Sequence, residues 1–149
     1  MTMLRDATHA DVRAIVALGE MMHAESPHYR VLRFDGEKLA ATVAQLIDAP
    51  AGLVRVVEQG GEIVAGVLAL AVEHWCSRDL VSCDLAVFVR ADHRGSLIGA
   101  RLLDDYRAWA TGLGCAMVQF GVMTGINVEQ TQALAMRLGW KRQGVVLCA

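Results

Sequence analysis

The stretch from Leu85 to Tyr106, LAVFVRADHRGSLIGARLLDDY, constrains the fold more than any other part of the chain. An apolar run ends at Arg90, a short charged turn follows, and apolar residues then recur with helical spacing. Residues 80–89 are rich in Val and Leu, as in a buried strand, and residues 98–112 carry one apolar stripe, as in an amphipathic helix. Since residues 115–123 predict a further strand, we expect a right-handed parallel crossover here.

The segments around this crossover predict a mixed sheet. Two strands, 53–59 and 62–74, flank Gly60-Gly61, which is typical of a two-residue hairpin turn. The order predicts an α/β fold with a mixed, mostly antiparallel central sheet flanked by helices, as a single domain over residues 1–149. The other expected elements are a short N-terminal strand, helices at 9–24 and 36–48, a last helix capped by Asn127-x-x-Gln130 and ending before Gly139, a final strand in WKRQGVVLC, and a core that includes Tyr106, Trp109 and Trp140.

Charge and cysteine usage argue against two kinds of site. The net charge of −2 lacks the basic excess of most nucleic-acid-binding domains, so we expect no nucleic-acid partner. The four cysteines form no CxxC pair, and His74 with Cys76 is the only close Cys/His pair. Because a structural zinc site needs four ligands, we expect no metal.

The distribution of apolar residues bears on location and assembly. The longest apolar run, Ile63 to Val72, is shorter than the ~20 residues that a helix needs to cross a bilayer, so we expect no membrane partner. The N-terminus, MTMLRD, runs directly into charged residues, so we expect no signal peptide and a reduced, cytoplasmic protein. A hydrophobic content of 54% leaves room for an exposed apolar patch and a homodimer.

The turn between the strand at 80–89 and the helix at 98–112 predicts an anion site. Amides in the first turn of a helix lack intrahelical partners, and the helix dipole adds positive potential there. Glycines allow a ligand to approach the backbone, and Arg94 adds charged donors, so we expect a phosphate site over Arg94 to Ala100. The spacing excludes a Walker A loop and a GxGxxG dinucleotide motif, but an ordinary tight turn with a solvated arginine also fits it.

At this point the chain resembles the GCN5-related N-acetyltransferase (GNAT) superfamily. RGSLIGARLL is similar to motif A of that family, Arg/Gln-x-x-Gly-x-Gly/Ala. LRDATHADVRAIVAL resembles its first strand and helix, VFVRADHRG its central strand and turn, and ALAMRLGW a late helix that ends in Gly and an aromatic residue. The resemblance covers nearly the whole chain and implies an enzyme that transfers acetyl from acetyl-CoA, as co-substrate, directly to an amine in a ternary complex without a metal.

The resemblance also implies where CoA binds. The arm of CoA would run between the strands at 80–89 and 115–123, which splay apart in the family. Phe88 and Val89 would hydrogen-bond the pantetheine arm and the thioester from the strand edge, and Asn127 would touch the same arm, although a role as helix cap alone also explains Asn127. The pyrophosphate would be held by the backbone amides of Arg94, Gly95, Ser96, Leu97, Ile98, Gly99 and Ala100.

The acceptor side is less defined. The implied acceptor is a small-molecule amine, including an amino acid or an aminoglycoside-like polyamine, or a protein amine. The substrate-binding candidates are Glu25, Tyr29 and Glu73. The catalytic residues stay unassigned. The candidate bases are Glu25, Glu73, His74 and Asp84, and Asp84 can also be interpreted as a hydrogen-bonded core carboxylate.

Three departures from the family pattern bear on activity. Leu97 replaces the first motif glycine, and its Cβ is expected to narrow the approach of CoA. The common helix tyrosine falls on Ala135, and a strand glutamate of some members falls on Gly121. Alternatives to an active enzyme are therefore a catalytically degenerate acyl-CoA-binding or regulatory module, and an accessory dimer that does not bind CoA.

Overall fold

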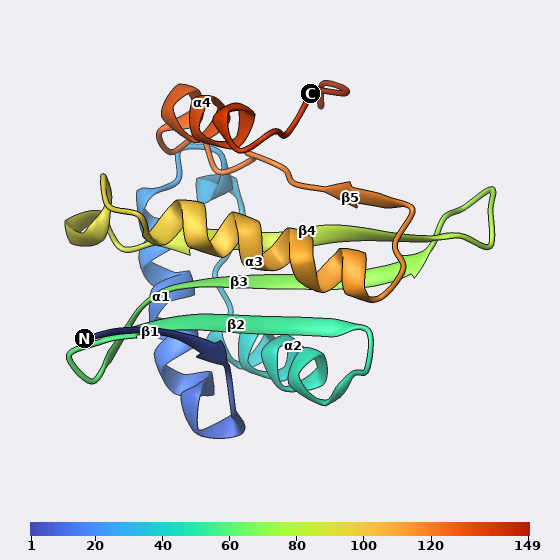
Figure 1. The fold of residues 1–149 in the computed structure, drawn as a ribbon. Coiled ribbons are helices and arrows are strands. Elements are labelled where there is room, and N and C mark those ends of the chain that lie inside the picture. Colours follow the sequence, from blue (N-terminus) through green and yellow to red (C-terminus); the bar gives the residue numbers. More distant parts are fainter.

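The computed structural model describes all residues, 1–149, and contains one five-stranded sheet in the order β1-β2-β3-β4-β5 (Figure 1). Neighbouring strands are antiparallel except for β4 and β5, which are parallel and are joined through α3. This confirms the predicted mixed, mostly antiparallel α/β fold and the parallel pairing of the two strands that the crossover joins. The elements are β1 (Thr2–Asp6), α1 (Val12–Glu25), α2 (Gly36–Asp48), β2 (Gly52–Gln59), β3 (Glu62–Glu73), β4 (Leu80–Val89), α3 (Ile98–Gly112), β5 (Met117–Gln119) and α4 (Val128–Arg137), with 3₁₀ turns at His9–Asp11, Tyr29–Val31 and Ala91–His93.

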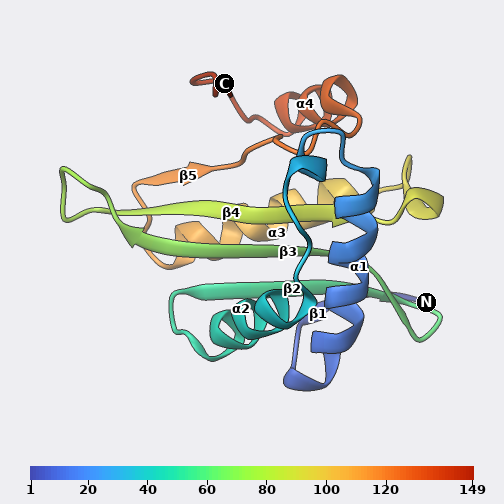
Figure 2. The same cartoon turned by 180° about the vertical axis from the view of Figure 1, so that it is seen from behind.

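Helices cover both faces of the sheet. Figure 1 shows α3 in front of the sheet and α4 beside the β5 edge, and Figure 2 shows α1 and α2 against the opposite face. On the α3 face, Leu102 and Tyr106 are fully buried and pack with β2 and β3, and Trp109 and Trp140 are half-buried against them, as predicted. On the other face, Val43 and Leu46 of α2 join a second apolar cluster. Burial on both faces explains why β2 and β3 are nearly continuous apolar runs.

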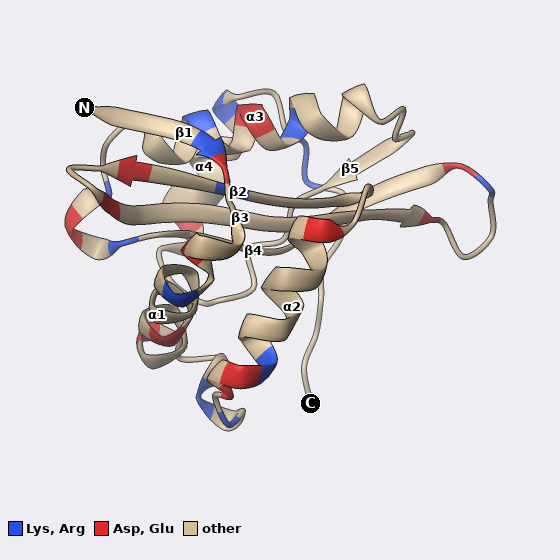
Figure 3. Cartoon of the chain, turned by 90° about the horizontal axis from the view of Figure 1, so that it is seen from below, with Lys and Arg blue, Asp and Glu red and all other residues tan.

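The hairpin between β2 and β3 forms as predicted. Gly60 and Gly61 have φ of 61° and 81°, the left-handed backbone that a type I′ turn needs at both central positions. No helix is both long enough and apolar enough to cross a bilayer. Lys, Arg, Asp and Glu are interspersed along the chain rather than gathered by sign (Figure 3).

Three predicted features at the C-terminal end are wrong. The strand expected at 115–123 is only Met117–Gln119, because after Gln119 the Gly121 amide donates to the Asp84 side chain instead of to a strand. Asn127 does not cap α4 with its side chain; its backbone is left-handed, with φ of 47°, and the helix begins at Val128. Residues 140–149 form no strand, since the three-residue β5 offers a minimal edge for pairing, and the apolar side chains of 145–147 remain exposed.

Candidate functional site

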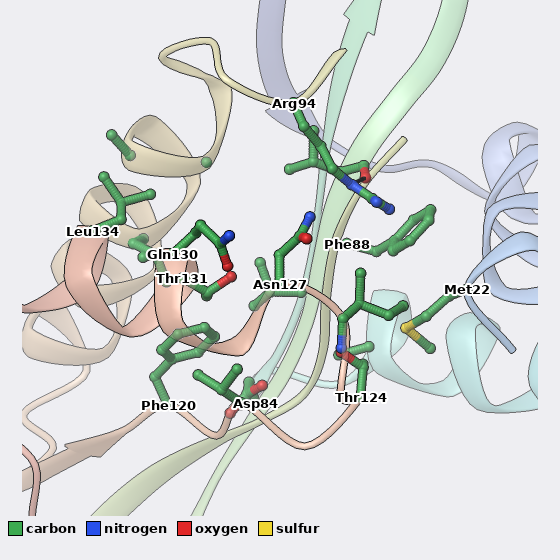
Figure 4. A pocket seen from close by; sticks show the side chains of 18 of the residues that line it. Met22, Asp84, Phe88, Arg94, Phe120, Thr124, Asn127, Gln130, Thr131 and Leu134 are labelled. Carbon is green, nitrogen blue, oxygen red and sulfur yellow. Dashed lines mark hydrogen bonds between the residues drawn. The ribbon is translucent and has the colours of Figure 1, made fainter. Parts of the chain in front are cut away.

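A cavity of about 690 Å³ opens where β4 and β5 separate (Figure 4). The two strands pair only over Val81 to Cys83, and beyond this point β4 continues alone to Val89 while the other chain segment turns towards α4. Figure 4 shows α4 side chains on one side of the cavity and Met22 of α1 on the other. The splayed strands that the family resemblance implies are thus present, and they leave one edge of β4 uncovered.

A β-bulge determines which backbone groups of β4 face this cavity. Leu68 pairs with Ala86 and the next residue, Ala69, pairs with Asp84, so Leu85 is the extra residue. The Arg90 amide donates to the Val64 carbonyl at 2.9 Å, and successive strand residues point their N–H and C=O groups to opposite edges. The backbone of Val89 therefore faces the cavity.

Phe88 differs from its predicted role. In the same alternation its backbone N–H and C=O face Gly66 of β3, so they are not available to a pantetheine arm. Its ring lines the cavity instead. Because adjacent strand residues face opposite edges, only one of Phe88 and Val89 can face the cavity, and the phase set after the bulge makes it Val89.

The 94–100 turn presents a set of free amides. The N–H groups of Gly95, Ser96, Leu97, Gly99 and Ala100 donate to no group of the chain, and that of Ile98 makes only a 3.4 Å contact with Ser96 Oγ. Gly95 has φ of 78°, which favours glycine. Free amides at the N-terminus of a 15-residue helix suit a diphosphate, so the residues present fit the anionic part of CoA.

Two side chains of this turn differ in how they are placed. Leu97 has φ of −76°, which any L residue adopts, and its side chain is 78% exposed, so its Cβ imposes no backbone strain. Ile98 is buried in the core beneath α3, so only its backbone lies at the turn. The other residues expected there, including Gly99 and Ala100, line the cavity.

The side chain of Arg94 is hydrogen-bonded to other groups of the chain. Its Nε donates to the Val89 carbonyl at 2.8 Å, and its two terminal nitrogens bind both carboxylate oxygens of Glu25, one of them at 2.7 Å. The guanidinium also lies 5.3 Å from the centre of the Phe88 ring. It is therefore not a free phosphate ligand in this arrangement.

Glu25 reaches the site only through Arg94. The Arg94 guanidinium holds the pKa of Glu25 below its usual value, and the carboxylate does not line the cavity. Both facts make Glu25 a poor candidate for a base.

Asp84 is the carboxylate that lines the cavity. It lies at the fork between β4 and β5, where its Oδ1 accepts a hydrogen bond of 2.8 Å from the Gly121 amide. Burial raises the pKa of Asp84 to about 6, because the charged form loses its hydration. An ionised carboxylate with this pKa can accept a proton at neutral pH, and among the four candidate bases only Asp84 is placed to do so.

Tyr29 enters the same cavity from the loop after α1. Burial and the nearby negative charge of Asp84 both raise its pKa, so the phenol stays protonated at neutral pH. The loop is held by Ser26, which is fully buried, accepts from the Tyr29 amide and donates to the Thr124 carbonyl. No local pattern indicates this role of Ser26, since its partner lies 98 residues away.

The structure does not bring Glu73 and His74 to the cavity. Glu73 pairs with Leu80 at the start of β4, at the opposite end of that strand from Val89. His74 lies in the adjacent turn, where its Nδ1 is 3.2 Å from Cys76 Sγ. No three His, Cys, Asp or Glu side chains are grouped to hold a metal ion.

Asn127 does line the cavity, and Figure 4 shows it between Arg94 and Phe120. Ala135 is buried, and Gly121 binds Asp84 through its amide, so neither position supplies a side chain to the chemistry. The helical pattern of α4 could have indicated which of its faces meets the cavity. The lining residues that sequence reasoning missed include Met22, Phe120, Thr124, Gln130, Thr131 and Leu134.

Comparisons with known proteins agree with this geometry. The model of the Acetyltransferase (GNAT) family matches residues 18–140. No curated protein matches the chain. Solved structures with the same fold include aminoglycoside N-acetyltransferase AAC(6')-Iy in complex with CoA, with a TM-score of 0.80 and 14% identity over 100% of this chain and 93% of that one.

Two other solved structures share the fold. The integron cassette protein HFX_CASS3 from the mobile metagenome of Cole Harbour Salt Marsh has a TM-score of 0.79 and 19% identity over 98% of this chain and 88% of that one. The ribosomal-protein-alanine N-acetyltransferase of Brucella melitensis biovar Abortus 2308 has a TM-score of 0.73 and 14% identity over 99% and 97%. At these identities the likeness shows the fold.

Proposed function

Because the chain belongs to the acetyltransferase (GNAT) family, we propose that it is an acetyl-CoA-dependent N-acetyltransferase in which Asp84 is the proton acceptor. One observation carries the proposal: free amides of the 94–100 turn, the uncovered edge of β4 and the half-buried carboxylate of Asp84 share one cavity. When bound, acetyl-CoA supplies the acetyl group as a thioester. The free amides would hold its diphosphate, and the amide-containing arm would lie along the uncovered edge of β4.

The chain's own groups can perform the proton chemistry. An alkylamine with a pKa of ~10 is unprotonated in only roughly one molecule in a thousand at neutral pH, so it must lose a proton before it attacks. Asp84, ionised above about pH 6, would accept that proton directly or through one water. The Val89 amide, on the open edge, would donate a hydrogen bond to the carbonyl oxygen on which negative charge develops.

The leaving thiolate needs less help. Its pKa is near the ~8.5 of a cysteine thiol, so it leaves without full protonation. This is consistent with Ala135 and Gly121, which supply no acid. Attack of the neutral amine would form the C–N bond and break the C–S bond. Asp84 would already hold the first proton of the ammonium, and the second would pass from the amide nitrogen to the leaving thiolate or to water.

The acceptor would be a cationic amine, because Asp84 is the negative charge that lines the cavity and Tyr29 offers a hydroxyl beside it. AAC(6')-Iy and the ribosomal-protein-alanine N-acetyltransferase are named for a small-molecule and a protein acceptor, and both classes remain in the proposal. We further propose that residues 1–149 act as one domain in the cytoplasm, without nucleic-acid or membrane partners. The exposed apolar side chains of residues 145–147 support a homodimer.

The experiment is thiol release from acetyl-CoA with a panel of aminoglycosides, polyamines, amino acids and N-terminal peptides. We expect release with at least one amine, and a loss of about 100-fold or more in Asp84→Asn. Glu73→Gln is the matched control, because it also removes one carboxylate charge but lies outside the cavity. Saturable CoA binding without release on any amine would instead indicate an acyl-CoA-binding module, and absence of CoA binding would indicate an accessory protein.

A further inference from the structure

The pairing of Arg94 with Glu25 joins the turn before α3 to the C-terminal end of α1. Both nitrogens of the guanidinium fork meet both carboxylate oxygens, while Nε covers the Val89 carbonyl. Glu25 and Arg94 are 69 residues apart, so no local pattern requires this contact. The pair therefore places a permanent cation across the edge of β4 where the cofactor arm would lie.

A diphosphate at the 94–100 turn would meet the same cation. Arg94 immediately precedes Gly95, whose free amide begins the turn. The other basic side chains that line the cavity are His93 and Arg137, and the negative one is Asp84. A guanidinium fork binds phosphate and carboxylate with the same two-point geometry, so the two anions would be alternative partners for it.

We propose that Glu25 is a positioning residue that competes with the diphosphate of CoA for Arg94, an inference that rests on the proposed function. Transfer of Arg94 to the diphosphate would uncover the Val89 carbonyl for the cofactor arm. It would also leave the Glu25 carboxylate without its cation, next to the loop that carries Tyr29 into the cavity.

Two consequences follow from this exchange. An unpaired Glu25 would add negative charge near the cavity without lining it, and this charge favours a cationic amine there. Cofactor and acceptor binding then support each other, and by linkage the coupling is reciprocal. The natural order of binding is then cofactor first. The pair is partly exposed, with 23% and 36% of the two side chains accessible, so the competition should change CoA affinity several-fold rather than by orders of magnitude.

Calorimetric titration of the full chain with CoA tests the exchange. Glu25→Gln should bind CoA about twofold to fivefold more tightly than the wild type, because Arg94 is released. Glu20→Gln is the matched control: it removes the same charge from an exposed position on α1 that has no ion pair, and should change the affinity less than about twofold. Arg94→Gln should weaken binding, and adding Glu25→Gln to it should give no gain.

The outcomes separate this inference from the proposed function. A wild type that does not bind CoA overturns the proposed function itself. If the wild type binds CoA, two results would overturn only the exchange. One is a CoA affinity of Glu25→Gln no higher than that of Glu20→Gln, and the other is an equal gain in affinity from Glu25→Gln when Arg94 is already replaced. Thermal unfolding without ligand checks that each variant folds, and Glu25→Asp, whose shorter side chain also weakens the pair, replaces Glu25→Gln if that variant does not.

Discussion

At the scale of single residues, Asp84 determines how the activity should depend on pH. Its pKa of about 6 means that the base is ionised above this pH and protonated below it. We expect kcat/KM to fall below pH 6 along a limb centred near that value. Asp84→Asn should lose this pH dependence together with most of its activity. If kcat/KM of the variant still falls below pH 6, the titrating group is not Asp84.

The same residue should cost the protein stability at neutral pH. The pKa of Asp84 is raised from 3.8 to about 6 on folding, so the folded state holds the proton more tightly than the unfolded state. Stability from this group is therefore present in acid, is lost as the pH rises from about 4 to 6, and stays lost above 6. Asp84→Asn, which keeps an oxygen for the Gly121 amide, should raise the free energy of unfolding by about 2 kcal/mol at pH 7.5 and by much less at pH 4.5. Urea unfolding at both pH values measures this, and a gain that is equal at the two would contradict the assigned cause.

The site residues that could be predicted from the sequence are those whose role depends only on the local backbone geometry. The 94–100 turn lies where an apolar strand meets a helix, and this geometry frees the amides whatever the rest of the fold does. The pairing of Glu25 with Arg94, in contrast, depends on how α1 lies against the sheet, which no local pattern contains. Glu73 was a candidate by residue type alone, and the strand register places it at the wrong end of β4.

At the scale of elements, the backbone conformation of Gly95 determines the direction in which the 94–100 turn enters α3. Its φ of 78° disfavours any L side chain, although a Cβ there would meet no atom within 4 Å. Gly95→Ala should therefore lower stability by about 1 kcal/mol and weaken CoA binding as the amides shift. Gly112→Ala, at the last residue of α3 with equally open space and no positive φ, should be neutral or slightly stabilising. Thermal unfolding and CoA titration of the two variants provide the test, and equal effects would show that φ at Gly95 is not the cause.

Elements with a strong local pattern were predicted almost to the residue. The helices at 36–48 and 98–112 end where proline or glycine interrupts the apolar stripe, and the structure has the same bounds. The predicted length of β5 was wrong because the apolar run continues past Gln119, whereas the backbone leaves the sheet there and the Gly121 amide binds Asp84. A strand ends where its partner ends, and that is a tertiary property.

At the scale of the whole molecule, hydrogen bonds join the loop after α1 to the segment before α4, and both segments contribute residues to the cavity lining. Ser26 and His28, after α1, contact the carbonyls of Thr124 and Met123, before α4. The walls of the cavity are thus tied together across the uncovered edge of β4. A ligand in this cavity would contact residues from both of these segments, so its binding should raise the free energy of unfolding of the whole domain.

This linkage predicts a selective thermal shift. A ligand at 100 times its Kd stabilises the folded state by about 2.7 kcal/mol, which for a chain of this size raises Tm by roughly 5–10 °C. We expect shifts of this order with acetyl-CoA and with CoA. NAD has a diphosphate but no pantetheine arm to pair with the edge of β4, so its shift should be much smaller. An equal shift with NAD would indicate that only the 94–100 turn, and not the β4 edge, takes part in binding.

Gly99→Glu should abolish the shift with CoA. The new carboxylate would lie among the free amides at the start of α3, where it repels a diphosphate and competes with it for the same donors. A Cβ at this position would lie 3.4 Å from Leu134 Cδ2, the end of a flexible side chain, so the fold should tolerate the change. Gly144→Glu adds the same charge where a Cβ meets nothing within 4 Å, and should keep the full shift. If Gly99→Glu melts as a folded protein and still responds to CoA like Gly144→Glu, the diphosphate does not bind at this turn.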